Sequence, residues 1–363
     1  MVGAGKFGQM HLRAFSQMQR DGLAELVGIA DVDADARAAG SQAYAAPAFA
    51  DHREMLAEVN PDGVSIATPD FLHREIAIDC LRAGKHILVE KPLDVTIEGC
   101  RQIAAAAGAA GLLVQVDLHK RYDPYHRELE RLAAAGALGD IQYGYAYMED
   151  RIEVPRDWFP QWAPRTSPAW FLGVHMYDLI RWVLKSDGRL VSATGCKKKL
   201  AGLGIDTYDS IQAKVVFKNG ASFSFDTSWI LPDGHEAVVN QGIRVVGSEG
   251  ILEIDTQDRG ARGCFSVVGA GRGRIGSPGM QTFNPGFFME SRDAQGRTRY
   301  GGYGIESIQN FAENVKHLLA GGSAEDLRGT YADAQDGLEV TRIAVAVHRS
   351  AEAGGALVDL DGI

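Results

Sequence analysis

The chain begins with a glycine-rich turn that has only two residues in front of it. Gly3-Ala4-Gly5-Lys6-Phe7-Gly8 fits the pattern G-x-G-x-x-G, and Met1 and Val2 precede it. In such a turn the first glycine permits a tight strand-to-helix connection, the second lets the backbone approach a pyrophosphate, and the third lets helix and strand pack closely. The pattern is typical of dinucleotide binding, although a chain with 43 glycines can also match it as an ordinary loop.

The residues after the turn favour dinucleotide binding. Residues 9–18 have the apolar spacing of an amphipathic helix, and residues 25–30 form an apolar run typical of a buried parallel strand. The run ends at Asp31, about twenty residues past the last glycine, where a carboxylate can bind the ribose hydroxyls. A carboxylate there repels a 2′-phosphate and no arginine follows at once, so the sequence favours NAD over NADP. The alternative is that Asp31 only caps the next turn.

Composition excludes several classes of protein. A length of 363 residues allows about two domains. A net charge of −10 without a basic run argues against a nucleic-acid partner. No apolar stretch approaches the ~20 residues needed to span a membrane, and signal-peptide features are absent. Four cysteines without ligand spacing suggest reduced thiols, so we expect a cytoplasmic protein without a metal site.

The first third of the chain alternates strands and helices. Helices are expected at 34–44, 51–58, 71–83 and 96–110, and strands at 63–68, 86–90 and 112–116. This repeated order of strand, helix and strand predicts a parallel sheet with helices on both faces.

The pattern changes after residue 123. Strands are expected at 141–148, 191–199, 210–217, 221–229, 241–246 and 250–254, and helices at 124–135, 307–319 and 331–351. Asn219-Gly220 between two of the strands is a strong hairpin signal. The second domain is therefore predicted to hold a mostly antiparallel sheet, and the glycine-rich stretch 266–286 a loop or lid.

Two segments carry residues suited to proton transfer. Glu90-Lys91-Pro92 follows a parallel strand, at the sheet edge where ligands of open α/β folds bind. A partly desolvated Lys91 beside a cationic nicotinamide would have a lowered pKa, although most lysines at strand ends are simply solvated. His175 and Asp178 are three residues apart and share a face if this segment is a helix. The alternative for His175 is a core histidine satisfied by a backbone carbonyl.

Taken together, these motifs resemble the Gfo/Idh/MocA oxidoreductase family. The resemblance rests on the opening glycine turn, on Ala67-Thr68-Pro69 with His73, on Glu90-Lys91-Pro92, and on Gly173-x-His175-x-x-Asp178, in the right order and separation across the chain. It implies an α/β protein with an N-terminal Rossmann domain, a doubly wound parallel sheet at residues 1–118. A C-terminal α+β domain at residues 119–363 would hold the large, mostly antiparallel open sheet.

The family resemblance also implies a reaction and a site. The reaction is NAD(P)-dependent hydride transfer at a carbinol of a sugar, cyclitol or related polyol. Lys91 would hydrogen-bond the reacting hydroxyl, His175 would accept its proton, and Asp178 would bind substrate or fix His175. The Lys91–Pro92 bond is expected to be cis. Cofactor contacts would come from Gly3, Gly5, Lys6, Phe7, Gly8, Asp31, Thr68, Pro69, His73, Glu90 and Lys91.

One position departs from the family pattern. Inositol-type members carry an Asp four residues before the histidine, and this chain has Phe171 there. His175 then needs another partner, or Lys91 does more of the proton work. Trp170 and Phe171 could instead form an apolar wall for a sugar ring, which weakens a myo-inositol assignment. Further candidate substrate contacts are Tyr122, Trp229, His235 and Tyr303.

The family resemblance also leaves two alternative functions open and implies that the protein forms an oligomer. Some relatives are glycosidases that oxidise and re-reduce a sugar carbon with NAD, and the fold also occurs in non-catalytic NAD-binding regulators. Glu90-Lys91-Pro92 and His175 argue against a regulator, which needs no pair for proton transfer. Family members usually associate through the open sheet, so we expect a homodimer or homotetramer.

The short N-terminus raises a question about the first strand. A strand normally precedes the glycine turn, in the middle of the sheet. Its loss would leave backbone groups unpaired and the turn poorly anchored. We therefore expect a truncated or misassigned start upstream of Met1, and a gain in stability and NAD affinity when the missing apolar residues are restored.

Overall fold

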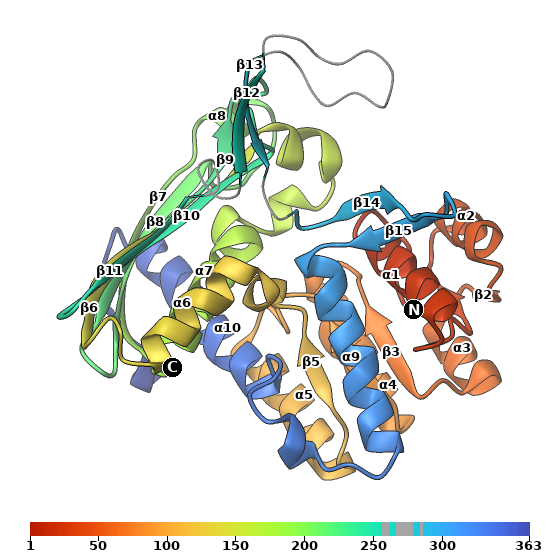
Figure 1. The fold of residues 1–363 in the computed structure, drawn as a ribbon. Coiled ribbons are helices and arrows are strands. Elements are labelled where there is room, and N and C mark those ends of the chain that lie inside the picture. Colours follow the sequence, from red (N-terminus) through yellow and green to blue (C-terminus); the bar gives the residue numbers. More distant parts are fainter. Residues whose placement is uncertain (256–260, 266–278, 284–285) are drawn as a thin grey trace.

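The computed structural model describes residues 1–255, 261–265, 279–283 and 286–363 (Figure 1). A parallel sheet with helices on both faces occupies one end of the molecule, and a larger sheet occupies the other. Most of the predicted loop at 266–286 lies outside the described residues, but 279–283 form a strand. No helix among the described residues has the length and apolar character needed to cross a membrane.

The N-terminal unit is a doubly wound parallel sheet. Its strands are β1 (Ile29–Ala30), β2 (Ala48–Phe49), β3 (Gly63–Ile66), β4 (His86–Val89) and β5 (Val114–Val116). Its helices are α1 (Gly8–Asp21), α2 (Ala34–Tyr44), α3 (His52–Val59), α4 (His73–Arg82) and α5 (Ile97–Ala110). β1 pairs with β2, and β3, β4 and β5 lie in that order. The predicted strand at 25–30 was too long, since only its last two residues pair.

Met1 and Val2 lie between the two halves of this parallel sheet. Val2 forms parallel bridges with both Ala30 and Ile66. Its N–H donates to the carbonyl of Ser65 at 2.8 Å, and its own carbonyl accepts from the N–H of Ala67 at 2.8 Å. The expectation of a poorly anchored turn is therefore wrong, because the chain just before Gly3 is bonded to the strands on either side.

The second sheet has seven strands in the order β11-β10-β6-β9-β8-β7-β16. They are β6 (Ile141–Arg151), β7 (Gly188–Cys196), β8 (Ser210–Phe217), β9 (Ser222–Leu231), β10 (Val239–Gly247), β11 (Ile251–Asp255) and β16 (Val358–Asp359). All neighbours are antiparallel except β6 and β9, which run parallel. The mostly antiparallel prediction is confirmed, and Asn219-Gly220 does turn between β8 and β9, with Gly220 at φ 91°.

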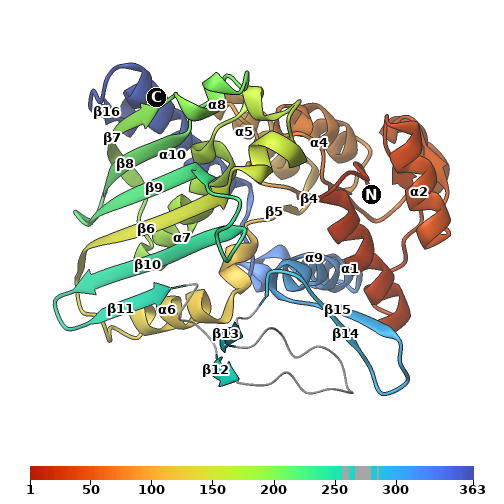
Figure 2. The same cartoon turned by 90° about the horizontal axis from the view of Figure 1, so that it is seen from above.

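One face of this large sheet packs on helices and the other is exposed. The helices on the covered side include α7 (Val174–Leu184) and α10 (Ala334–Glu352), as Figures 1 and 2 show. Along β8, buried Ile211 and Ala213 alternate with exposed residues, as expected for a strand with one core face. Tyr143 and Tyr145 remain 48% and 38% exposed. Association through this face stays a prediction.

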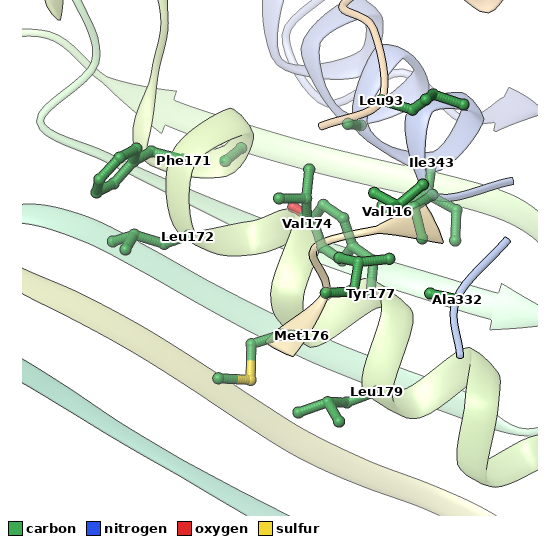
Figure 3. Close-up of a cluster of buried hydrophobic side chains, with 14 of the residues drawn as sticks. Leu93, Val116, Phe171, Leu172, Val174, Met176, Tyr177, Leu179, Ala332 and Ile343 are labelled. Carbon is green, nitrogen blue, oxygen red and sulfur yellow. The ribbon is translucent and has the colours of Figure 1, made fainter. Parts of the chain in front are cut away.

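The remaining elements lie outside these two sheets. They are α6 (Pro124–Ala134), α8 (Lys199–Gly202), α9 (Tyr303–Leu319), the hairpins β12 (Ala261–Phe265) with β13 (Gly279–Phe283) and β14 (Met289–Arg292) with β15 (Thr298–Gly301), and short turns such as η2 (His119–Tyr122) and η5 (Ala169–Gly173). Figure 3 shows Leu93, Val116 and Ile343 gathered near Tyr177, so the core runs from β5 through α10 to α7.

Helix α9 packs against the parallel sheet, although it lies near the C-terminal end of the chain. Its Ile308 and Phe311 form one buried cluster with Met18 of α1, with Leu88 of β4 and with Leu113, which directly precedes β5. The boundary at residue 118 stays a prediction, and this late helix contributes to the N-terminal core.

We predict that Ile308→Ala lowers the free energy of unfolding by about 2–5 kcal/mol, because the side chain is 2% exposed and its loss leaves a cavity. Leu319→Ala on the same helix is the control. That side chain is 60% exposed, so its change should stay within about 0.5 kcal/mol. Urea unfolding measures both, and equal losses would contradict the packing described here.

Candidate active site

The glycine turn has the shape that a bound pyrophosphate requires. Gly3 lies at φ 88°, and a Cβ there would collide with the carbonyl of Ala67. A Cβ on Gly8 would collide with the carbonyl of Gly3, whereas a Cβ on Gly5 would meet nothing within 4 Å. Helix α1 begins at Gly8 without a side-chain cap. The open space at Gly5 and the uncapped helix N-terminus therefore fit an anionic phosphate group.

Asp31 lies beside this turn at the end of β1. One carboxylate oxygen accepts from the N–H of Ala4 at 2.6 Å, and the other accepts from the N–H of Asp33 at 2.8 Å. Asp31 thus braces the glycine turn and also caps the next one. Arg37 donates to the backbone carbonyl of Asp31 at 2.7 Å. An arginine therefore lies close to Asp31, although none directly follows it in the sequence.

A cleft of about 340 Å³ runs from the glycine turn to Lys91. Thr68 and Pro69 line one part of it, as predicted. Aromatic side chains line another part, where Phe7 stacks on Phe159 with ring centroids 5.7 Å apart. This cleft is where the structure gathers most of the predicted cofactor contacts.

A larger cavity of about 690 Å³ adjoins the cleft. The two share the residues Lys6, Phe7, Lys91, Trp158, Phe159 and Phe171. Beyond them the cavity is lined by polar groups that include His119, Lys120, Asp150, His175, Gln241 and Tyr303. The two predicted proton-transfer residues, Lys91 and His175, therefore line one cavity at the end of the cofactor cleft.

Lys91 is buried and held by the segment before α7. Its Nζ donates to the carbonyl of Phe171 at 2.8 Å and lies 4.1 Å from the centroid of that ring. The Lys91–Pro92 bond is cis, as predicted. Burial lowers the pKa of Lys91, and the carboxyls of Glu90, Asp70 and Asp150 offset part of that fall.

A buried polar network supports the strand end that carries Lys91. The two ring nitrogens of His11 lie 2.7 Å from Ser65 Oγ and 3.1 Å from Glu90 Oε1. Burial raises the pKa of Glu90, but the hydrogen bond from His11 and the surrounding basic groups, Lys91 among them, outweigh burial and bring that pKa to about 2. Asp117 lies 3.6 Å from His11, and burial and the charge on Glu90 raise its pKa to about 7. Hydrogen bonds from His11 thereby join helix α1 to the ends of β3 and β4, and the carboxyl of Asp117 after β5 lies within ion-pair distance.

His175 sits in the first turn of α7, among cationic groups. Its ring centroid lies 4.6 Å from that of His119, and its Nδ1 has no hydrogen-bond partner among the described residues. Burial lowers the pKa of His175 well below its usual value, and His119, Lys91 and Lys120 lower it further. His175 is therefore a neutral ring.

The structure does not bring Asp178, Tyr122 or Trp170 into the cavity. Asp178 lies on α7 as expected, but both its oxygens accept from Arg121, at 2.8 and 2.5 Å. Tyr122 donates to Asn310 Oδ1 at 2.7 Å and lines a different cavity. These partners come from distant segments, which helical spacing cannot reveal.

Two further corrections concern aromatic and imidazole rings. Trp170 stacks on His348 of α10 with centroids 5.3 Å apart, and only Phe171 of the predicted pair lines the cavity. The ring nitrogens of His73 lie 2.7 Å from the carbonyl of Pro92 and 3.0 Å from that of Thr68. His73 is 1% exposed, so it joins the two loops that line the cleft and does not line the cleft itself.

The sequence prediction did not include several residues that line the cavity. One of them, Asp150, could have been recognised from its position in the strand pattern. The buried positions of β6 include Ala146, Met148 and Asp150, so an acidic residue falls on the apolar face of a strand. Phe159 and Phe287 left no comparable signal, because they reach the cavity from irregular segments.

Family comparisons agree with this architecture. Residues 1–118 match the family described as "Oxidoreductase family, NAD-binding Rossmann fold", and residues 126–253 match the "GFO/IDH/MocA C-terminal domain". The chain belongs to the Gfo/Idh/MocA oxidoreductase family. Its N-terminal unit is thus the NAD-binding Rossmann domain of that family.

Individual relatives are more distant. Inositol 2-dehydrogenase 2 of Saccharopolyspora erythraea is 31% identical over 56% of this chain, and the match spans 58% of that protein. The structure of GenD2 from gentamicin A biosynthesis in complex with NAD is similar, with a TM-score of 0.76 and 25% identity over 99% of this chain and 94% of that one. Scyllo-inositol dehydrogenase from Lactobacillus casei has a TM-score of 0.76 at 18% identity, covering 99% and 98% of the two chains, and shares the fold.

We predict that Asp178→Ala destabilises the protein by about 3–5 kcal/mol, because it leaves the buried Arg121 without its main partner. Asp206→Ala is the control, since Asp206 is 87% exposed and its pair with Lys197 contributes about 0–1 kcal/mol. Denaturant unfolding measures both. Unchanged stability together with a raised KM would instead restore Asp178 as a substrate contact.

Proposed function

We propose that this chain is an NAD-dependent oxidoreductase that transfers a hydride between the nicotinamide and a carbinol of a sugar, glycoside or cyclitol. The observation that carries the proposal is the position of Lys91 and His175. Both line the cavity of about 690 Å³ that adjoins the cofactor cleft. Similarity to an inositol 2-dehydrogenase supports a polyol substrate, and similarity to GenD2 in complex with NAD supports the cofactor.

The residues of this chain would divide the work between binding and proton transfer. When bound, NAD supplies the hydride acceptor. Gly3, Gly5 and Gly8 would hold its pyrophosphate, and Asp31 its ribose. The buried ammonium of Lys91 would donate a hydrogen bond to the reacting oxygen, in a cavity where burial strengthens that bond. His175 would face the same oxygen as a neutral ring.

Phe171 favours a substrate range wider than inositol. Its ring lies between the cleft and the cavity, where it contacts Lys91 and stacks at an angle against Trp162, 5.3 Å away. An apolar ring face of this kind packs against the C–H face of a sugar. We therefore propose that glycosides and keto-sugars are substrates alongside cyclitols.

The deciding experiment measures NADH formation across a panel of inositols, aldoses and glycosides, with NADP in parallel. Oxidation of one panel member with net NADH supports the proposal. Release of an aglycone with bound NAD and no net NADH indicates the NAD-dependent glycosidase. NAD binding with no turnover of any member indicates a regulator.

We predict that Lys91→Ala lowers kcat by about 10²–10⁴-fold, because it removes the donor to the reacting hydroxyl. Cofactor affinity should change little, since the glycine turn and Asp31 are untouched. Lys214→Ala, on the exposed face of β8, is the control. Steady-state kinetics and NAD titration by fluorescence give the two readouts, and undiminished oxidation by Lys91→Ala would refute the assignment.

We predict that Asp31→Asn shifts cofactor preference toward NADP by at least tenfold, or about 1.4 kcal/mol. The amide oxygen can still accept from Ala4, while the charge that repels a 2′-phosphate is gone and Arg37 is close by. Asp35→Asn, on the exposed first turn of α2, is the control. The ratio of kcat/KM for NADP and NAD measures the shift, and an unchanged ratio would show that Asp31 only caps the turn.

A further inference from the structure

Asp150 is a buried carboxyl that no group of the described chain satisfies. It is 1% exposed, and neither of its oxygens has a hydrogen-bond partner among the described residues. It lies on the core face of β6 and lines the same cavity as Lys91 and His175. Buried polar groups are nearly always bonded, so an unsatisfied carboxyl inside a substrate cavity indicates a ligand that satisfies it.

Charged groups from several elements surround this carboxyl. Lys91 at the end of β4 and Lys120 of η2 attract its ionised form, and Trp229 of β9 offers an indole N–H close by that does not reach hydrogen-bond geometry. His119 of η2, His175 of α7 and Tyr303 of α9 line the same cavity. Burial outweighs these attractions and raises the pKa of Asp150 to about 8.

His175 is the poorer proton acceptor of the two. Burial and the nearby basic side chains of Lys91 and Lys120 both disfavour a protonated ring at this position. Ionised Asp150, by contrast, becomes neutral when it takes up a proton, which burial favours. Lys91 and Asp150 line the same cavity, so a hydrogen-bond donor and a proton acceptor are both available to a ligand bound there.

We propose, resting on the function proposed above, that Asp150 is the catalytic residue that accepts the proton of the reacting hydroxyl. The carbinol carbon loses a hydride, with two electrons, to the oxidised nicotinamide. The O–H bond breaks, its proton passes to a carboxylate oxygen of Asp150, and the electron pair of that bond forms the second bond of the ketone. Lys91 donates to the reacting oxygen throughout.

The proposal fixes the direction of the pH dependence. Oxidation needs ionised Asp150, so kcat/KM should rise with pH and level off above about pH 8. Ketone reduction needs the protonated acid and should fall over the same range. Asp150→Asn should lower oxidation by about 10²–10⁴-fold and lose this ionisation. His175→Asn should keep the ionisation in the pH profile, and its rate of oxidation should fall by less than about tenfold.

The experiment measures kcat/KM from pH 6 to 10, with the panel substrate that the wild type oxidises, for wild type, Asp150→Asn and His175→Asn. Asp226→Asn, on the exposed face of β9 and bonded to Tyr145, is the control expected to match wild type. An ionisation that persists in Asp150→Asn, or a larger loss in His175→Asn, overturns the proposal. No turnover by wild type overturns the proposed function itself.

Thermal unfolding gives a second readout that needs no substrate. Burial without partners raises the pKa of this carboxyl in the folded protein above its value in the unfolded chain. The folded wild type is therefore destabilised at every pH at which the unfolded chain would ionise the group. The Tm of Asp150→Asn should therefore equal or exceed that of wild type, with a difference that grows as pH rises from 3.8 toward about 8. A lower Tm than wild type at every pH would show a structural carboxyl and overturn the proposal.

Discussion

The candidate active site depends on one hydrogen bond, by which the side chain of Lys91 joins two segments that are far apart in the sequence. Its backbone belongs to the end of β4, and its Nζ bonds to the carbonyl of Phe171, 80 residues away, just before α7. That bond aligns the carboxyl edge of the parallel sheet with the helix that carries His175. Because the ammonium is buried, it gains from every acceptor around it, and displacement would leave a charge unpaired.

The carboxyls near Lys91 differ because their surroundings differ. Glu90 accepts from His11 and has a pKa of about 2, so it stays ionised and structural. Asp150 has no such donor, and burial raises its pKa to about 8. Of these two acids near one lysine, Glu90 therefore carries a permanent charge, while Asp150 can take up and release a proton. In active sites, different surroundings commonly give two neighbouring acids different pKa values in this way.

Local signals accounted for most of the fold. The glycine turn, the alternation of strands and helices, and Asn219-Gly220 each depend on neighbouring residues, so the sequence predicted them. The parallel pairing of β6 with β9 and the packing of α9 on the N-terminal sheet depend on contacts between segments far apart. Nothing in the composition of those segments specifies their partners.

The candidate site shows the same division. Lys91 and the glycines could be found because they adjoin strands of the parallel sheet, whereas His175 was singled out by its place in a motif that resembles the family pattern. The role of Asp178 could not be predicted, because its spacing from His175 does not reveal that its carboxylate pairs with Arg121, 57 residues away in the sequence. Asp150 could have been found from the alternation of β6, where an acidic residue falls on the buried face.

The size and lining of the cavity bear on which substrates it can take. At about 690 Å³ it lies well inside the range of about 300–1,000 Å³ typical of sites for small organic ligands. Its lining includes polar groups such as Lys91 and Asp150, while Phe159, Phe171 and Phe287 provide apolar surface. A sugar that bears an apolar or second-ring substituent would cover more of these rings than a single ring can, in keeping with the wider substrate range proposed above.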